Sequence, residues 1–157
     1  MKYLSIIIII STLLFSSTLS NAAKRSGRAD NNKWLTEVRT YKHNFLVKET
    51  EMTTAQRDAF IPLYTDMENE IYQVNREARD LESSVSKNVA NASENDYEKA
   101  AQALSDTKVK EGEIENAYFQ KFSKILSKKQ LFLLKRAENR FARNMLDHNK
   151  RSQKASK

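Results

Sequence analysis

Glycine and proline, the residues that most often make turns, are almost absent from this chain. Gly27 and Gly112 are the only glycines among 157 residues, and Pro62 is the only proline. A β-sheet needs many tight turns, and tight turns depend on these residues. The chain also has no cysteine, so neither disulfides nor thiolate metal sites can hold a fold together. The sequence therefore predicts an all-α protein.

The first 22 residues have the three-part pattern of a secretory signal peptide. Lys2 gives a basic start, an apolar run reaches Phe15, and small residues precede a cleavage site expected after Ala22 or Ala23. A membrane anchor is the alternative, but the run is shorter than the roughly 20 apolar residues that span a bilayer. We expect export, cleavage, no stable membrane insertion, and one domain from the remaining chain of about 135 residues.

Charge is distributed unevenly along the exported segment. Residues 23–48 carry a net charge of +5 and residues 116–157 a net charge of +10, whereas residues 49–115 carry −9. Basic ends suggest nucleic acid as a partner, but export separates the chain from nucleic acid, so we expect none. Acidic proteins or anionic membrane surfaces are the partners that such ends favour.

Apolar spacing predicts two helices in the first half of this segment. Trp34, Val38, Tyr41 and Phe45 predict an amphipathic helix over about residues 31–48, with Leu35 and Leu46 beside the stripe. A longer helix over about residues 53–89 has a heptad seam, which requires a partner helix. Pro62 lies in its first part and is expected to kink or interrupt it. The seam residues are Phe60, Tyr64, Met67, Ile71, Val74, Ala78, Leu81 and Val85.

A third helix and two irregular ends are also expected. The helix starts near Ser93, and Gly112 with its charged neighbours should leave its middle thinly packed. Residues 23–30 are expected to be a flexible basic N-terminus, and residues 148–157 a disordered basic tail with too few apolar groups to fold. The residues of the third helix that should point inward are Tyr97, Ala101, Leu104, Ile114, Tyr118, Phe122 and Ile125.

A five-residue phrase occurs twice, as MTTAQ over residues 52–56 and as LSKKQ over residues 126–130. Each copy has the spacing of a capping box, in which a hydroxyl residue and a glutamine three positions later satisfy each other's backbone amides. Each copy therefore predicts a helix start, with a structural role for its residues. The motif residues are Met52, Thr53 and Gln56 in the first copy and Leu126, Ser127 and Gln130 in the second.

In a small, exported, cysteine-free helical chain, these two phrases resemble the twice-occurring LTxxQ motif of the Spy/CpxP family of periplasmic proteins. Met52 and Ser127 are conservative departures from the leucine and threonine of that motif. AFIPLY at residues 59–64 and KRAENRF at residues 135–141 are similar to the versions of this family found in Bacteroidetes. The resemblance covers residues 31–147. It implies an elongated, bent helical hairpin of about four helices that pairs into a curved antiparallel homodimer in the periplasm.

Family members act as ATP-independent chaperones, as inhibitors of envelope-stress sensor kinases or as metal-responsive regulators. The resemblance therefore implies a holdase-type chaperone for unfolding or aggregation-prone proteins. The alternative is a CpxP-like envelope-stress or metal-responsive signalling regulator that binds a sensor protein. A Skp-like chaperone would need short β-strands near each end, and no β-rich run lies near residue 30 or 145.

The last helix, which starts after Ser127, has a basic stripe opposite its own apolar face. At 100° per residue, Leu131, Leu134, Glu138, Phe141 and Met145 form the core stripe. The opposite stripe can attract acidic or unfolding clients through its cations and hold them through its apolar groups. A solvated charged face with a dimer contact at Phe132 is the alternative. The candidate partner-binding residues are Lys129, Phe132, Leu133, Arg136, Arg140 and Arg143.

Neither catalysis nor a bound cofactor is indicated by the sequence. There is no nucleophile motif and no glycine-rich phosphate loop, so we expect no enzyme activity. His43 and His148 are the only histidines, and neither has a second histidine three or four positions away to form a helical ligand pair. We interpret both as solvated surface residues and expect no metal site and no cofactor.

Overall fold

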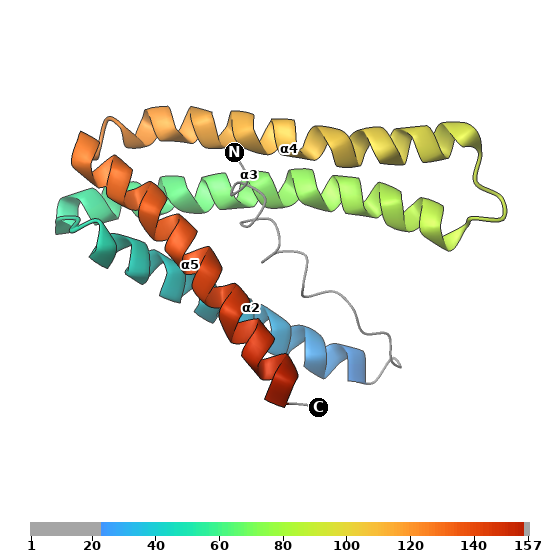
Figure 1. Ribbon diagram of the computed structural model, residues 1–157, viewed down its shortest axis with the longest axis horizontal. Coiled ribbons are helices and arrows are strands. Elements are labelled where there is room, and N and C mark those ends of the chain that lie inside the picture. The colour runs from blue at the N-terminus through green and yellow to red at the C-terminus, as the bar shows by residue number, and fades with distance from the viewer. Residues whose placement is uncertain (1–22, 156–157) are drawn as a thin grey trace. The chain divides into compact units, whose positions relative to one another are not determined.

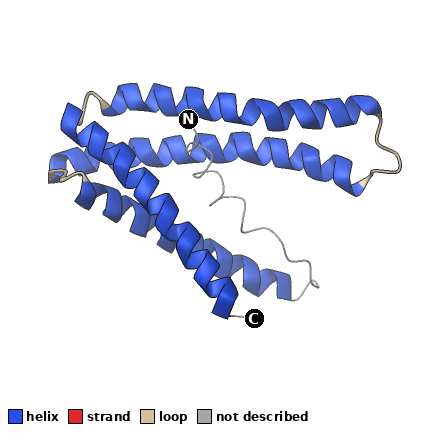
Figure 2. Cartoon of the chain, viewed as in Figure 1, coloured by secondary structure: helices blue, strands red, loops and turns tan. Residues whose placement is uncertain are grey.

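The computed structural model describes residues 23–155, which form four helices joined by short turns (Figures 1 and 2). The helices are α2 (Ala23–Glu49), α3 (Thr54–Lys87), α4 (Glu94–Phe122) and α5 (Lys128–Ala155). No strand occurs in this part of the chain, which confirms the all-α prediction. None of these helices has both the length and the apolar character needed to cross a membrane. The expected signal peptide, residues 1–22, lies outside the described residues.

The first and last helices, α2 and α5, are longer than the sequence pattern indicates. α2 begins at Ala23 rather than near residue 31, and α5 continues to Ala155, through most of the segment expected to be disordered. Lysine, arginine and alanine occur in both segments, and these residues have good helix propensity. The prediction relied on apolar spacing, which does not detect a helix extended by propensity alone.

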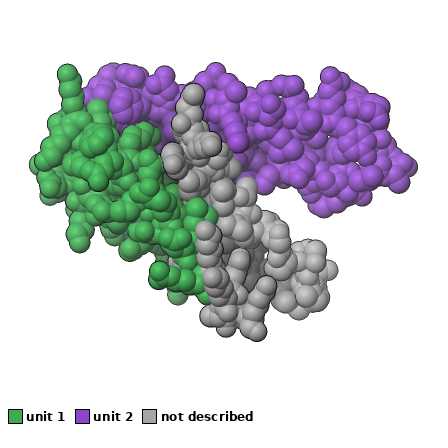
Figure 3. Space-filling model, viewed as in Figure 1, with its two compact units in different colours: residues 1–57, 126–157 green, residues 58–125 purple. Residues whose placement is uncertain are grey.

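The four helices divide into two compact units (Figure 3). Among the described residues, unit 1 comprises residues 23–57 and 126–155, and it therefore contains α2, the first turn of α3 and α5. Unit 2 comprises residues 58–125, with the rest of α3 and all of α4. Each unit is described by itself below.

In unit 1, the C-terminal half of α2 packs against α5. The Phe141 ring lies 6.0 Å from the Tyr41 ring and 5.9 Å from the Phe45 ring, measured between centroids. Leu46 and Thr50 are fully buried, and the Thr50 hydroxyl donates to the Leu46 carbonyl at 2.7 Å. A threonine can be buried here because this hydrogen bond satisfies its polar group.

The end of α2 is a Schellman motif with a non-glycine residue at its left-handed position. Glu51 has a φ of 53°. Its amide donates to the Lys48 carbonyl, and the next amide, of Met52, donates to the Val47 carbonyl. This pair of hydrogen bonds closes a helix end, usually with glycine at the left-handed residue. The chain accepts a glutamate there, at a cost of about 1 kcal/mol, and the Glu51 side chain has a partner on α5, described below.

In unit 2, α3 and α4 lie side by side in antiparallel directions (Figure 1). Aromatic residues fill one end of this pair, where the Phe60 and Phe122 ring centroids are 4.8 Å apart. Tyr64 and Tyr118 pack against Phe122, with centroid distances of 6.0 and 6.2 Å. Phe60, Tyr64 and Met67 are buried, as the heptad seam predicts. α3 continues through Pro62 as one helix, so the interruption that was one of the two expected effects of this proline does not occur.

Polar residues are buried in the middle of the same helix pair. The Asn75 side-chain amide donates to the Glu111 carboxylate, and both residues are buried. Thr107, also buried, donates to the Ala103 carbonyl at 2.8 Å. The sequence pattern favoured Ile71 and Val74 as the seam residues in this region. Both are only half-buried. At this point of α3 the side that faces α4 is centred on Asn75, which contacts Glu111.

The far end of the helix pair is open. The expected inward residues Leu81, Tyr97 and Leu104 are 44%, 39% and 43% exposed. Ala100, Thr107 and Glu111 are buried instead, so the inward stripe of α4 is displaced from the predicted one in its first half. The prediction for Tyr118 and Phe122 is confirmed by their burial. Apolar spacing placed the helix correctly but chose larger side chains as the inward ones.

Candidate functional site

The two copies of the repeated phrase form capping boxes at the starts of α3 and α5. The Thr53 amide donates to Gln56 Oε1 at 3.1 Å, and the Gln56 amide donates to the Thr53 hydroxyl at 3.2 Å. In the second copy, the Ser127 amide donates to Gln130 Oε1 at 2.9 Å, and the Gln130 amide donates to the Ser127 hydroxyl at 3.2 Å. These are the reciprocal hydrogen bonds of a capping box.

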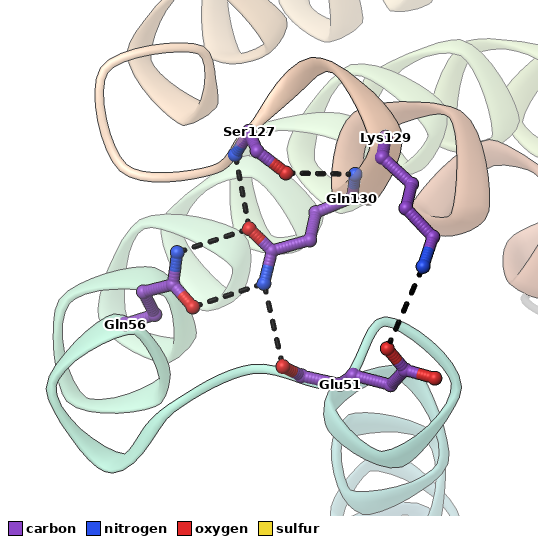
Figure 4. A network of polar contacts seen from close by, with 5 residues as sticks. All are labelled: Glu51, Gln56, Ser127, Lys129 and Gln130. Atoms are coloured by element: carbon purple, nitrogen blue, oxygen red, sulfur yellow. Dashed lines mark hydrogen bonds and ion pairs between the residues drawn. The ribbon is translucent and has the colours of Figure 1, made fainter.

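The two capping boxes are joined through their glutamines (Figure 4). Gln56 Nε2 donates to Gln130 Oε1 at 3.0 Å, and Gln130 Nε2 donates to Gln56 Oε1 at 2.9 Å. Each amide oxygen therefore accepts from its own cap and from the opposite glutamine. Glutamate can serve in a capping box as well as glutamine, but it has no amide to donate. This reciprocal pair explains why both copies contain glutamine.

The glutamine pair also reaches the end of α2. Gln130 Nε2 makes a longer contact, 3.4 Å, with the carbonyl oxygen of Glu51, the left-handed residue of the Schellman motif (Figure 4). The Glu51 carboxylate lies 3.8 Å from Lys129 Nζ, and both side chains are exposed. An exposed ion pair contributes little stability, so the backbone contact is the more important link. Three helix ends of unit 1 meet at this network.

A third capping box, which the sequence analysis missed, starts α4. Ser93 is the N-cap, its hydroxyl accepts from the Asp96 amide, and the Asp96 carboxylate accepts from the Ser93 amide. These hydrogen bonds lower the pKa of Asp96, with the bond from the Ser93 backbone as the main cause. The spacing of serine and aspartate was visible in the sequence. This box makes no side-chain pair with another cap, which makes it a natural control for the other two.

In the candidate partner-binding stripe of α5, some residues point into solvent and others contact the end of α2. Phe132 is 62% exposed, and the Arg136 guanidinium lies 5.7 Å from the centre of its ring. Arg143 is also exposed, whereas Leu133 is half-buried. On the opposite face, the expected core residues Leu131, Leu134 and Phe141 are buried, and buried Glu138 pairs with Lys135 at 3.0 Å.

Two cations of the stripe are engaged with the end of α2. Lys129 pairs with Glu51, as described above. Arg140 forms an ion pair with Glu49, and its guanidinium lies 5.0 Å from the centre of the Phe45 ring. Arg140 therefore fastens α2 to α5, a role that sequence reasoning missed because Glu49 is 91 positions away. Phe132, Arg136 and Arg143 form the part of the stripe that faces outward.

Unit 2 contains two titratable groups in unusual surroundings. The Tyr118 hydroxyl donates to the Glu70 carboxylate at 2.5 Å. This hydrogen bond, together with burial and the nearby negative charge, raises the pKa of Tyr118 to about 12. Burial raises the pKa of Glu111, and the hydrogen bond from Asn75 partly offsets this effect. Each group is hydrogen-bonded across the α3–α4 pair, Tyr118 to Glu70 and Glu111 to Asn75.

The histidines were expected on the surface, but His43 is buried, with 8% exposure. His43 lies on the same side of α2 as Leu46 and Thr50, which its spacing of three and seven residues explains. The side chain of His148 is not described. Within the described residues, no group of three or more histidine, cysteine, aspartate or glutamate side chains is placed to hold a metal ion.

Comparisons with known proteins do not extend this picture: no protein-family model, no curated protein and no solved structure matches the chain. The resemblance to the Spy/CpxP family therefore rests on the motif residues quoted above.

Proposed function

We propose that the protein is a periplasmic, ATP-independent holdase-type chaperone of the Spy/CpxP type, without enzyme activity or a cofactor. Its clients would be unfolding, aggregation-prone or acidic proteins. The observation that carries this proposal is the outward part of the α5 stripe, where Phe132 is 62% exposed beside Arg136 and Arg143. A large exposed aromatic side chain next to cations is a binding surface for apolar segments of acidic proteins.

The rest of the described surface supports the same proposal. Ten large apolar side chains are exposed, and they are distributed over all four helices and the turn between α3 and α4. Many small apolar surfaces suit weak binding to many sequences, because promiscuous binders use broad and adaptable surfaces. A regulator of one sensor protein, the alternative from the sequence analysis, would instead need one tight interface.

An aggregation assay with two unrelated unfolding proteins tests the proposal. The wild-type protein should reduce light scattering from both clients without ATP. Phe132→Ser should weaken protection by speeding client release, because apolar contact holds the client after it arrives. Arg136→Gln with Arg143→Gln should slow association and reduce its salt dependence. The matched control is Ala117→Ser, since Ala117 is exposed on α4, outside the stripe, and is not one of the ten large apolar side chains.

Each result decides between the two functions. Protection of both clients, reduced by the α5 variants and retained by Ala117→Ser, supports the holdase. Absence of protection for both clients would contradict it and favour the signalling regulator. Protection unchanged by all the α5 variants would show that the binding surface lies elsewhere on the molecule.

A further inference from the structure

α2 carries an apolar stripe that faces away from its own buried side. Trp34, Val38, Tyr41 and Phe45 are spaced by four, three and four residues. At about 100° per residue, the mean direction of this outward α2 stripe lies about 110° from fully buried Leu46. Trp34 is 38% exposed and Tyr41 63% exposed. The stripe resembles a core stripe in the sequence, but in unit 1 Trp34 and Tyr41 are exposed, and Val38 and Phe45 are only half-buried.

α5 covers only the C-terminal end of the outward α2 stripe. Phe141 contacts the rings of Tyr41 and Phe45, and Arg140 lies over Phe45. Spacing of four, three and four residues is that of a coiled-coil seam, which is usually completed by a second helix. A seam over twelve residues is about 17 Å long, so about three turns of a partner helix would cover it.

α4 has an exposed seam of its own. Tyr97, Ala101 and Leu104 are spaced by four and three residues, and Tyr97 and Leu104 are 39% and 43% exposed. Ala101, also exposed, is small enough to leave room for an aromatic ring between its larger neighbours. These three residues, the α4 seam, were expected to point inward but lie at the open end of the α3–α4 pair.

The helix segments that carry the two seams have opposite net charges. α2 has seven basic and three acidic residues, and one of the three, Glu49, is engaged by Arg140. The segment of α4 over residues 94–115 has seven acidic and three basic residues. Like seams would repel each other, so two α2 helices or two α4 helices should not pair well. Opposite charges favour α2 against α4.

We propose that the outward α2 stripe of one copy of this chain docks on the α4 seam of a second copy. Each copy has both seams, so each copy can supply either side of the contact. The inference names the contact surfaces of the homodimer that the Spy/CpxP resemblance implies, and it rests on that resemblance, which the proposed function also uses. It does not require chaperone activity.

Disulfide cross-linking tests the contact. Because the chain has no native cysteine, only introduced cysteines can form a bridge. Val38→Cys and Ala101→Cys are prepared as separate full-length proteins, mixed in equal amounts and oxidised gently. A bridge in this mixture can only join two chains. The matched control mixes Val38→Cys with Val109→Cys, because Val109 is exposed on α4 but on a different side of that helix from Ala101. Covalent dimer is measured on a non-reducing gel, after helix content and melting temperature are checked for each variant.

We expect the Val38→Cys and Ala101→Cys mixture to give at least several-fold more covalent dimer than the control mixture. Trp34 is the only tryptophan, so its emission should also shift to shorter wavelength as the protein concentration rises. Equal cross-linking in both mixtures would overturn the proposal, and so would a monomer at every concentration in sedimentation. A monomer that still protects clients would refute this interface without contradicting the proposed holdase function.

Discussion

At the scale of single residues, the two glutamines of the repeated phrase link the starts of two helices, which neither copy could do alone. A capping box stabilises one helix start and is common in proteins. Here the two boxes share side-chain hydrogen bonds between Gln56 and Gln130, 74 positions apart. The free energy of the network should therefore depend on both glutamines together.

A double-mutant cycle can measure this dependence. Gln56→Ala and Gln130→Ala each remove both bonds of the pair, so the double variant should be less destabilised than the sum of the two. We expect a coupling free energy of about 1 kcal/mol or more from denaturant unfolding. The control cycle combines Gln130→Ala with Asp96→Ala, which share no hydrogen bond, and should be additive within about 0.5 kcal/mol. Additivity in both cycles would show that the glutamine pair contributes nothing.

Glu111 gives a prediction with a defined pH dependence. Burial raises the pKa of Glu111 above its unfolded value, which is about 4.3. Asn75, Arg79, Lys108 and Glu115 also influence this carboxyl group. A raised pKa means that the native state binds the proton more tightly than the unfolded state. The stability from Glu111 is therefore fully present below the unfolded pKa and is lost as the pH rises through the folded pKa.

The variant Glu111→Gln should remove this part of the pH dependence. Glutamine has nearly the same shape, and its oxygen can still accept from Asn75, so the variant should melt a few degrees higher than wild type at pH 7. The difference should shrink toward pH 4. Glu113→Gln is the control, because Glu113 is exposed on the same helix. Thermal melts between pH 4 and pH 8 measure both, and a lower melting temperature for Glu111→Gln at pH 7 would refute the explanation.

At the scale of helices, Arg140 and Arg143 lie three positions apart on α5 but should behave differently. Arg140 contacts Glu49 and Phe45 of α2, whereas Arg143 is exposed. Arg140→Gln should reduce the free energy of unfolding by roughly 1 kcal/mol, mainly through the lost cation–π contact and ion pair. Arg143→Gln should change it by less than about 0.5 kcal/mol. Equal effects in chemical denaturation would mean that Arg140 does not fasten the two helices.

Helix spacing in the sequence predicted which segments are helical better than it predicted which side chains are buried. Phe60, Tyr64 and Phe122 were recognised because bulky aromatic residues at heptad spacing fill the end of the α3–α4 pair. The α2 stripe was recognised as apolar, but its direction could not be predicted because nothing in α2 alone shows where α5 lies. Asn75 was missed for a related reason, since its side-chain amide is satisfied in the buried position only by pairing with Glu111 on another helix.

The candidate site was predicted in part. The spacing of Thr53 with Gln56 and of Ser127 with Gln130 was enough to predict the local hydrogen bonds, which involve residues within one turn. The link between Gln56 and Gln130 was not predicted, because it depends on the tertiary position of two helix starts. Arg140 was predicted on the outward face by helical geometry, but its long side chain reaches back to α2.

At the scale of the whole molecule, basic ends and an acidic middle make association sensitive to salt. If copies pair through the basic α2 and the acidic part of α4, attraction should weaken as the Debye length falls from about 10 Å at 0.1 M salt to about 3 Å at 1 M. The dimer dissociation constant, from sedimentation equilibrium, should therefore rise at least several-fold over this range. A constant or falling value would indicate an interface dominated by apolar burial instead.

The division of unit 1 between the two ends of the chain has a consequence for the order of folding. Unit 2 is one continuous segment, residues 58–125, so its α3–α4 contacts can form as soon as that segment is available. Unit 1 needs α2 and α5 together, and Gln56 meets Gln130 only when the loop between them closes. Closing a long loop costs entropy before any contact repays it. A helix pair that forms early brings Arg57 and Leu126 closer together and shortens the effective loop, so unit 1 should close after unit 2 has formed.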